Sequence, residues 1–368
     1  MSATDNLQEA DRLMTICNSC RYCEGLCAVF PAMEMRPTFK RGDLNLLANL
    51  CHNCGACFDA CQFAPPHEFK VNVPRALAKL RRDSWEAYVW PRAFAGVMRR
   101  NAAAVMFGSA AIVALFLAAV ATFSGRSTLL ATHTGAGAFY RIVPHEVMAS
   151  LFGAVFLYAV IALFMGLRAF WRDVSRDRPL PADAPSIWQA LRDAGSLRYL
   201  DGGGAGCADE TKSPKDSRRL FHHLTFYGFL LCFAATCAGT VYHYVAGRHA
   251  PYAWWEPPVI LGVAGGVGLV VGPLGLLMAR RRRRPELSDS AQGASDTAFT
   301  LLLLTTSFTG LALLAFRATP AMGLLLATHL GFVCAFFLAM PYSRFVHGLY
   351  RFAALVRYAQ EMRRAAAK

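Results

Sequence analysis

The sequence predicts an all-α protein in which a small helical N-terminal domain precedes a membrane domain of six transmembrane helices. Of its 368 residues, 55% are hydrophobic and only 17% are charged, whereas soluble domains have roughly 25% charged residues. The apolar residues are also unevenly distributed. Residues 1–100 have the mixed polarity of a soluble domain, and long apolar runs follow from about residue 101. This gradient predicts two domains, 1–100 and 101–368.

Six apolar runs approach the roughly 20 residues that a helix needs to cross a bilayer. They are Ala102–Phe123, His145–Phe170, Phe221–Val245, Pro257–Met278, Ala298–Phe316 and Met322–Met340. The partly polar stretch Tyr342–Tyr358 follows, and we expect it to form a helix at the membrane interface.

The positions of Lys and Arg predict the orientation of these spans. The segments Arg168–Arg219 and Arg280–Arg284 and the C-terminal tail are rich in basic residues. The other three loops contain only Arg126, Arg141, Arg248 and Arg317. Because loops rich in Lys and Arg stay in the cytoplasm, we expect a multi-pass protein of the bacterial inner membrane with both termini in the cytosol. The first residues lack the basic and apolar regions of a secretory signal.

The formal net charge of +14 lies mostly beside the apolar runs, where basic side chains contact anionic headgroups. We therefore expect membrane lipid, and no nucleic acid, as a partner. The longest segment between spans, residues 171–218, is predicted to be a cytosolic loop. Its glycine-rich part, Asp201–Cys207, lacks the strand–turn–helix context of a dinucleotide-binding motif, and we interpret it as a flexible connection.

Eight of the twelve cysteines lie in the first 61 residues, in two identically spaced sets. The sets are Cys17, Cys20, Cys23 and Cys27, and Cys51, Cys54, Cys57 and Cys61. This spacing is typical of bacterial two-cluster ferredoxins, in which the fourth cysteine of each run ligates the other cluster. We therefore expect one [4Fe–4S] cluster on Cys17, Cys20, Cys23 and Cys61, and a second on Cys27, Cys51, Cys54 and Cys57. Residues 1–100 are thus predicted to be an α-helical, ferredoxin-like domain with two [4Fe–4S] clusters.

Zinc is the alternative metal, because paired C-x2-C units also form structural zinc sites. The proline that usually follows the fourth cysteine is replaced by Ala28 and Gln62. Two sets of four cysteines exceed what a zinc ribbon needs, which favours iron–sulfur clusters. We find no acid, base or nucleophile in a pocket of this domain, so we predict one-electron relay and no catalytic residues.

Histidines at the ends of two predicted spans indicate a further metal group, because imidazole is a common axial ligand of haem iron. His222 or His223 is separated from His243 by roughly 30 Å of helix, and His329 is separated from His347 by roughly 27 Å. Since the two spans run antiparallel, we expect His243 to meet His329 near the outer face.

Near the inner face, we expect His347 to meet His222 or His223, with a weak preference for His223. The two pairs predict one or two b-type haems. The alternative is that these are polar residues at helix ends, where such side chains reach the interface. His145 is interpreted as an interface residue, although a ligand or a proton-handling group at a quinone pocket remains open.

Several of these segments together resemble the tricarballylate-utilization protein B family, also called citrate-utilization protein B. The matching segments are Ile16–Pro31, Leu50–Phe69, Arg219–Phe229, Tyr242–Tyr244, His329–Gly331 and Met340–Gly348. The resemblance implies a membrane electron-transfer protein that reoxidises the reduced FAD of a partner tricarboxylate dehydrogenase. It further implies that electrons pass through the clusters and b-haem to the quinone pool.

Two other functions stay open at this point. The flow of electrons could be reversed, with quinol oxidation feeding a cytosolic reductase. A transporter with a redox-regulated head is the other candidate, although the sequence has neither the internal repeats typical of transporters nor an acidic residue deep within a span.

Overall fold

The structure is a computed structural model that describes residues 3–99, 101–181, 183–200, 202 and 217–367. Throughout these ranges the chain forms helices and no strand, which confirms the predicted all-α class. Apart from Gly202, the glycine-rich connection Asp201–Cys207 lies outside the described residues.

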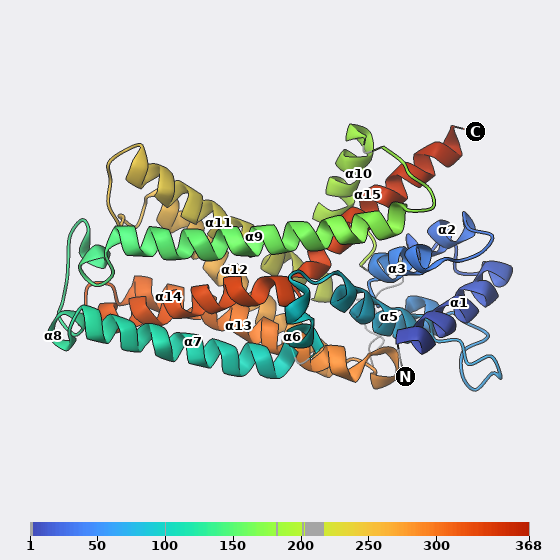
Figure 1. Ribbon diagram of the computed structural model, residues 1–368, viewed down its shortest axis with the longest axis horizontal. Helices are drawn as coiled ribbons and strands as arrows, with labels where there is room; N and C mark the ends of the chain where they lie inside the picture. The colour runs from blue at the N-terminus through green and yellow to red at the C-terminus, as the bar shows by residue number, and fades with distance from the viewer. Residues whose placement is uncertain (1–2, 100, 182, 201, 203–216, 368) are drawn as a thin grey trace.

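Six helices have the length and composition of membrane spans, as the sequence predicts. They are α7 (Asn101–Phe123), α9 (His145–Ser175), α11 (Ser217–Tyr244), α12 (Pro257–Arg281), α13 (Ser290–Ala315) and α14 (Met322–Ala339). They run along the long axis of the molecule (Figure 1). Short elements connect them at both ends, namely α6 (Ala95–Arg99), α8 (Arg126–Leu129), η2 (Ala138–Arg141), η3 (Pro285–Leu287) and η4 (Met340–Tyr342). Six such helices are compatible with a multi-pass membrane protein.

Several spans are longer than their apolar runs, because their polar ends pack against the N-terminal domain. The last turn of α9 carries Asp173, whose Oδ2 accepts hydrogen bonds from Asn45 Nδ2 at 2.7 Å and Tyr88 Oη at 2.5 Å. At the start of α13, Asp289 Oδ2 accepts from Arg82 Nη1 at 2.5 Å. Hydropathy finds the apolar part of a helix but not such polar extensions, whose buried groups need protein partners.

The N-terminal domain, here called the head, lies at one end of the molecule near both termini (Figure 1). It contains α1 (Ala3–Cys20), α2 (Val29–Glu34), α3 (Arg41–Leu50), α4 (Ala56–Asp59), α5 (Val73–Tyr88) and η1 (Arg92–Phe94). Leu13, Met14, Leu46, Leu47 and Leu77 are buried in its core. Asn72 caps α5, since its side chain accepts from the backbone N–H of Arg75, which satisfies a donor that the helix leaves unpaired.

The last helix, α15 (Val346–Ala366), leaves the membrane bundle and joins the head together with α10 (Ala184–Gly195). Arg36 Nη2 donates to both carboxylate oxygens of Glu361, at 2.9 and 2.8 Å, and Arg357 Nε donates to the same carboxylate at 2.8 Å. Both arginine side chains are only 1% exposed. The stretch Tyr342–Tyr358 is helical from Val346, as predicted, and α3, α9 and α10 pack against this helix, whereas its place at the membrane interface stays a prediction. The head core includes residues of α9 and α15, and the boundary at residue 100 stays a prediction.

Helix α11 packs closely along α12 through glycines. A Cβ atom on Gly265 would lie 2.7 Å from both the Cys232 nitrogen and the Gly228 oxygen. Such small residues let two helix backbones approach each other within a membrane. The contact also fixes which face of α11 turns away from α12.

We predict that Gly265→Ala destabilises the protein by about 1–3 kcal/mol, because the added methyl overlaps the α11 backbone. Gly262→Ala is the matched control, since its Cβ would lie 3.8 Å from Ala235 Cβ, an ordinary contact. Thermal unfolding in detergent measures both variants. Equal unfolding temperatures for the two would contradict the packing described here.

Candidate metal and cofactor sites

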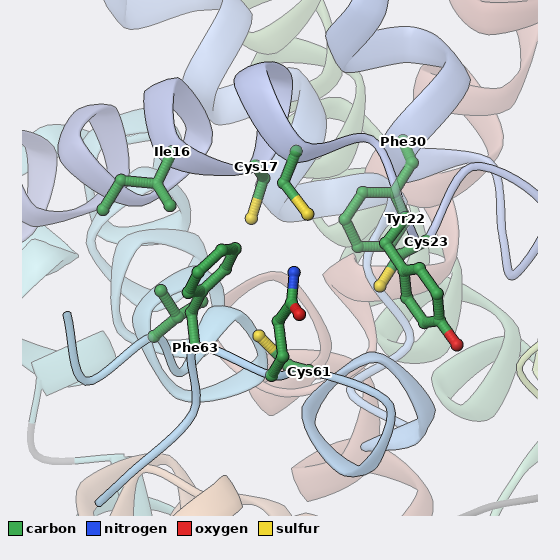
Figure 2. Close-up of a pocket in the computed structure, with 10 residues that line it drawn as sticks. Ile16, Cys17, Tyr22, Cys23, Phe30, Cys61 and Phe63 are labelled. Atoms are coloured by element: carbon green, nitrogen blue, oxygen red, sulfur yellow. The ribbon is translucent and has the colours of Figure 1, made fainter. Parts of the chain in front are cut away.

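Four cysteines from both sets line one hollow in the head. Helix α1 supplies Cys17 and Cys20, the following turn supplies Cys23, and Cys61 comes from the segment after α4. Figure 2 shows the sulfur atoms of Cys17, Cys23 and Cys61 directed into the same space. This first cysteine hollow has a volume of about 370 Å³, part of it open to solvent. Its other walls are mainly apolar and include Ile16, Phe30, Phe63 and Val71.

The remaining four cysteines, Cys27, Cys51, Cys54 and Cys57, line a second cysteine hollow of about 380 Å³. Its loop needs unusual backbone conformations. Gly55 at the start of α4 has φ 92°, and Asn53 has φ 55°, values that glycine and asparagine tolerate best. Each hollow therefore takes three cysteines from one set and the fourth from the other, which is the grouping that the spacing predicts.

The donor chemistry of each hollow fits an iron–sulfur cluster. Within the described part of the chain, no group of three or more His, Cys, Asp or Glu residues is close enough to hold one metal ion. Zinc would need its thiolate ligands about 2.3 Å from one point. Here the four thiols line a hollow in each case. The donor set, four cysteines in each hollow, is that of a [4Fe–4S] cluster.

Burial, together with the charges of neighbouring cysteines, raises the pKa of the Cys17 thiol to about 12 and that of Cys23 to about 11. The pKa values of Cys27 and Cys57 are raised for the same reasons. Four thiolates in an apolar hollow thus repel one another unless a cation neutralises them. Metal ions supply that charge, since a coordinating thiol is deprotonated.

A pair of histidines lies where the membrane bundle meets the head. The ring centres of His222 on α11 and His347 on α15 are 6.1 Å apart, with an angle of 79° between the rings. Metal–imidazole bonds are about 2.0 Å long, so two imidazoles on opposite sides of one metal have ring centres roughly 6 Å apart. His347 Nδ1 donates to the Arg344 carbonyl at 2.6 Å, which leaves its Nε2 as the acceptor. The described residues provide no hydrogen-bond partner for His222 Nδ1.

The sequence weakly favours His223 over the adjacent His222 as the partner of His347. In the structure, His222 is the residue that lies beside His347. The ring of His223 lies instead 5.8 Å from that of Tyr227. Adjacent residues point about 100° apart on a helix, so only one of the two can face α15. We call His222 and His347 the inner histidine pair.

The outer histidines are not arranged as expected. His243 stacks on His145 rather than meeting His329, with ring centres 3.6 Å apart and an angle of 10°. His249 Nδ1 lies 3.2 Å from His243 Nδ1. His329 faces α13, where its Nδ1 donates to the Thr306 carbonyl at 3.1 Å. The helical rise predicted the depth of these residues but not the face on which they lie. Rings stacked at 3.6 Å leave no room for a metal between them.

Three arginines that the sequence analysis did not single out donate to the backbone of the second cysteine loop, and two of them lie on the helices of the inner histidine pair. The Cys51 carbonyl accepts from Arg81 Nη1 at 2.6 Å and from Arg351 Nη2 at 2.8 Å. Arg218 Nη2 donates to the carbonyl of His52, the next residue, at 3.1 Å. Arg351 lies four residues after His347, and Arg218 lies four residues before His222. That spacing, one helical turn, is the signal by which the sequence could have revealed them.

Two family models match most of the chain. A family model described as "Citrate utilization protein B" matches residues 96–368, and its "Fer4-like domain" matches residues 10–87. The chain belongs to the citrate utilization protein B family. The protein of that name from Escherichia coli is 49% identical over 362 residues, which cover 98% of this chain and 94% of the relative.

No solved structure matches the chain. Membership of the citrate utilization protein B family, with a Fer4-like head, fits an electron-transfer role in citrate utilization. The Fer4-like match also agrees with iron–sulfur clusters as the metal groups of the head.

We predict that Cys20→Ser and Cys61→Ser weaken the same iron–sulfur signal, although 40 positions separate them, because both line the first hollow. Cys27→Ser, in contrast, should affect the second signal. Electron paramagnetic resonance of the reduced protein and its iron content test this, with a loss of about half the cluster iron expected in each variant. Cys237→Ser, at an exposed cysteine of α11, is the control. If Cys27→Ser and Cys20→Ser removed the same signal, the assignment would be wrong.

Proposed function

We propose that this protein carries electrons from a soluble flavoprotein into the membrane. The donor is the reduced FAD of a partner dehydrogenase that oxidises a tricarboxylate such as citrate or tricarballylate, and the final acceptor is the quinone pool. One observation supports this most strongly. Two four-cysteine hollows lie in the head, and a hydrogen bond from Arg351 connects the second to α15, the helix that carries His347 of the inner histidine pair.

Iron–sulfur clusters and haem exchange single electrons, which divides the two-electron oxidation of a flavin into single steps. In this proposal, the chain binds the clusters and the haem and sets the sequence in which electrons reach them. The first hollow includes Cys17 and Cys20 of α1, at the edge of the head, and Tyr22 beside it is 73% exposed. We assign the docking of the flavoprotein to this side.

The second hollow is next in the proposed order, because its Cys51 is the residue bonded to α15. Arg351 contacts the Cys51 carbonyl and lies one turn from His347. The inner histidine pair would hold a b-type haem through two imidazoles. The ring centres of His222 and His347, 6.1 Å apart, suit one haem. The rings of His145 and His243 are stacked too closely to hold a metal between them, so we propose a single haem in this chain.

The membrane topology of the proposal follows from the basic residues. The six long helices would span the inner membrane, with the head, the basic segments and both termini in the cytosol. This places the first hollow where a soluble dehydrogenase can reach it. No residue of the chain is assigned to substrate chemistry.

We predict that the dithionite-reduced minus oxidised spectrum of the purified protein shows a b-type haem. His222→Ala should abolish this signal, because it removes one of the two axial ligands. His223→Ala is the matched control and should retain it, since its ring lies beside Tyr227. Loss of the haem in His223→Ala with retention in His222→Ala would refute the assignment. Absence of haem from a wild-type protein with intact clusters would refute the haem site.

The complete function is tested in membrane vesicles that contain this chain and its partner dehydrogenase. We expect added tricarboxylate to reduce the quinone, and Cys54→Ser to stop this reduction without affecting tricarboxylate oxidation by the dehydrogenase with a soluble dye. Full quinone reduction in the absence of this chain would contradict the proposal.

A further inference from the structure

Four arginines lie one helical turn from the inner histidine pair, and one of them, Arg219, donates to the Ser196 carbonyl at 2.8 Å. Arg218 precedes His222 by four residues, Arg344 precedes His347 by three, and Arg351 follows His347 by four. Residues three or four apart share a helix face. By this spacing, the charged neighbours of both histidines on α11 and α15 are arginines. The strongest charges near the pair are therefore positive.

Carboxylates among the residues that the structure describes neutralise only part of this positive charge. Arg344 forms an ion pair with Asp296 at 3.1 Å, and Arg280 lies 3.8 Å from the same carboxylate. The described bonds of Arg351 go to neutral carbonyls, those of Asn49 at 3.3 Å and Cys51 at 2.8 Å. Arg81, which is only 2% exposed, also donates to the Cys51 carbonyl.

Such an excess of buried positive charge is unfavourable without an anion. The planar guanidinium fork matches a carboxylate, with which it forms two parallel hydrogen bonds. The arrangement therefore predicts an anionic ligand with carboxylates next to the two imidazoles.

We propose that Arg344, Arg351 and Arg218 form the binding site for the carboxylates of a haem held by His222 and His347. The inference rests on the haem site of the proposed function. The two sources of negative charge to be distinguished are the carboxylates of the porphyrin and the thiolates of the second cysteine hollow. The porphyrin is favoured because the arginines flank both histidines, on two different helices.

The site would also connect the two metal groups. Arg351 donates to the Cys51 carbonyl through Nη2, and a guanidinium has five donors, so the same side chain can bind a carboxylate. Removing its charge would lower the midpoint potential of the haem, because nearby cations stabilise the reduced form, which carries one more electron. This shift is a readout that does not depend on activity.

The test uses full-length protein with its clusters intact, purified from cells that make no haem. It is titrated with haem b and with the dimethyl ester of the same haem, which lacks the two negative charges. We expect the wild type to bind haem b roughly tenfold or more tightly than the ester, as charge-assisted hydrogen bonds predict. Arg344→Gln and Arg351→Gln should each reduce this preference and lower the haem midpoint potential. Arg363→Gln, at an exposed arginine of α15, is the control and should behave as the wild type.

Equal affinity of the wild type for haem b and the ester would overturn the carboxylate site while leaving the proposed function intact. A change in the cluster potential of Arg351→Gln, without any change in haem preference, would assign the arginines to the second hollow and likewise overturn it. Failure of both porphyrins to bind would overturn the haem site, and the carboxylate site with it. If either variant does not fold, the comparison of the two porphyrins with the wild-type protein still decides the question.

Discussion

The carbonyl oxygen of Cys51 accepts hydrogen bonds from Arg81 of α5 and Arg351 of α15. This contact joins three segments that are separate in the sequence, namely the second cysteine loop, α5 and the C-terminal helix α15. Buried polar groups must be paired within the protein, so the two guanidinium groups and the carbonyl fix one another. The loop that carries Cys51, Cys54 and Cys57 is thereby held against the helix that carries His347. The proposed electron route depends on this contact.

A second buried network holds α15 in place from its far end. Arg36 of the head and Arg357 of α15 both donate to Glu361. Breaking such a network leaves a charge buried without its partner, which is strongly destabilising. Helix α15 is thus fixed at two places along its length, and His347 and Arg351 gain a defined position relative to the head.

The cysteine grouping could be predicted from the sequence because the ligand spacing itself encodes it. In a run of four cysteines with this spacing, the fourth serves the neighbouring cluster, and the two hollows contain those sets. The six long apolar helices were predictable for a similar reason, since their length follows from the thickness of a bilayer.

The histidines were less predictable, because helical rise gives depth along a helix but not rotation about its axis. The close contact of Gly228 and Gly265 sets the rotation of α11, and this places His222, not His223, towards α15. His329 turns to Thr306 of α13 for its hydrogen bond, so it does not meet His243. The arginine contacts with the Cys51 loop were missed, because they join residues about 30 and 300 positions apart.

The most direct test of the account is the content of iron, acid-labile sulfide, zinc and haem in protein purified without oxygen. We expect about eight irons and about eight sulfides per chain from two [4Fe–4S] clusters, together with about one b-type haem. Zinc in place of iron and sulfide would contradict the account at its centre, because the two cysteine hollows would then not hold clusters.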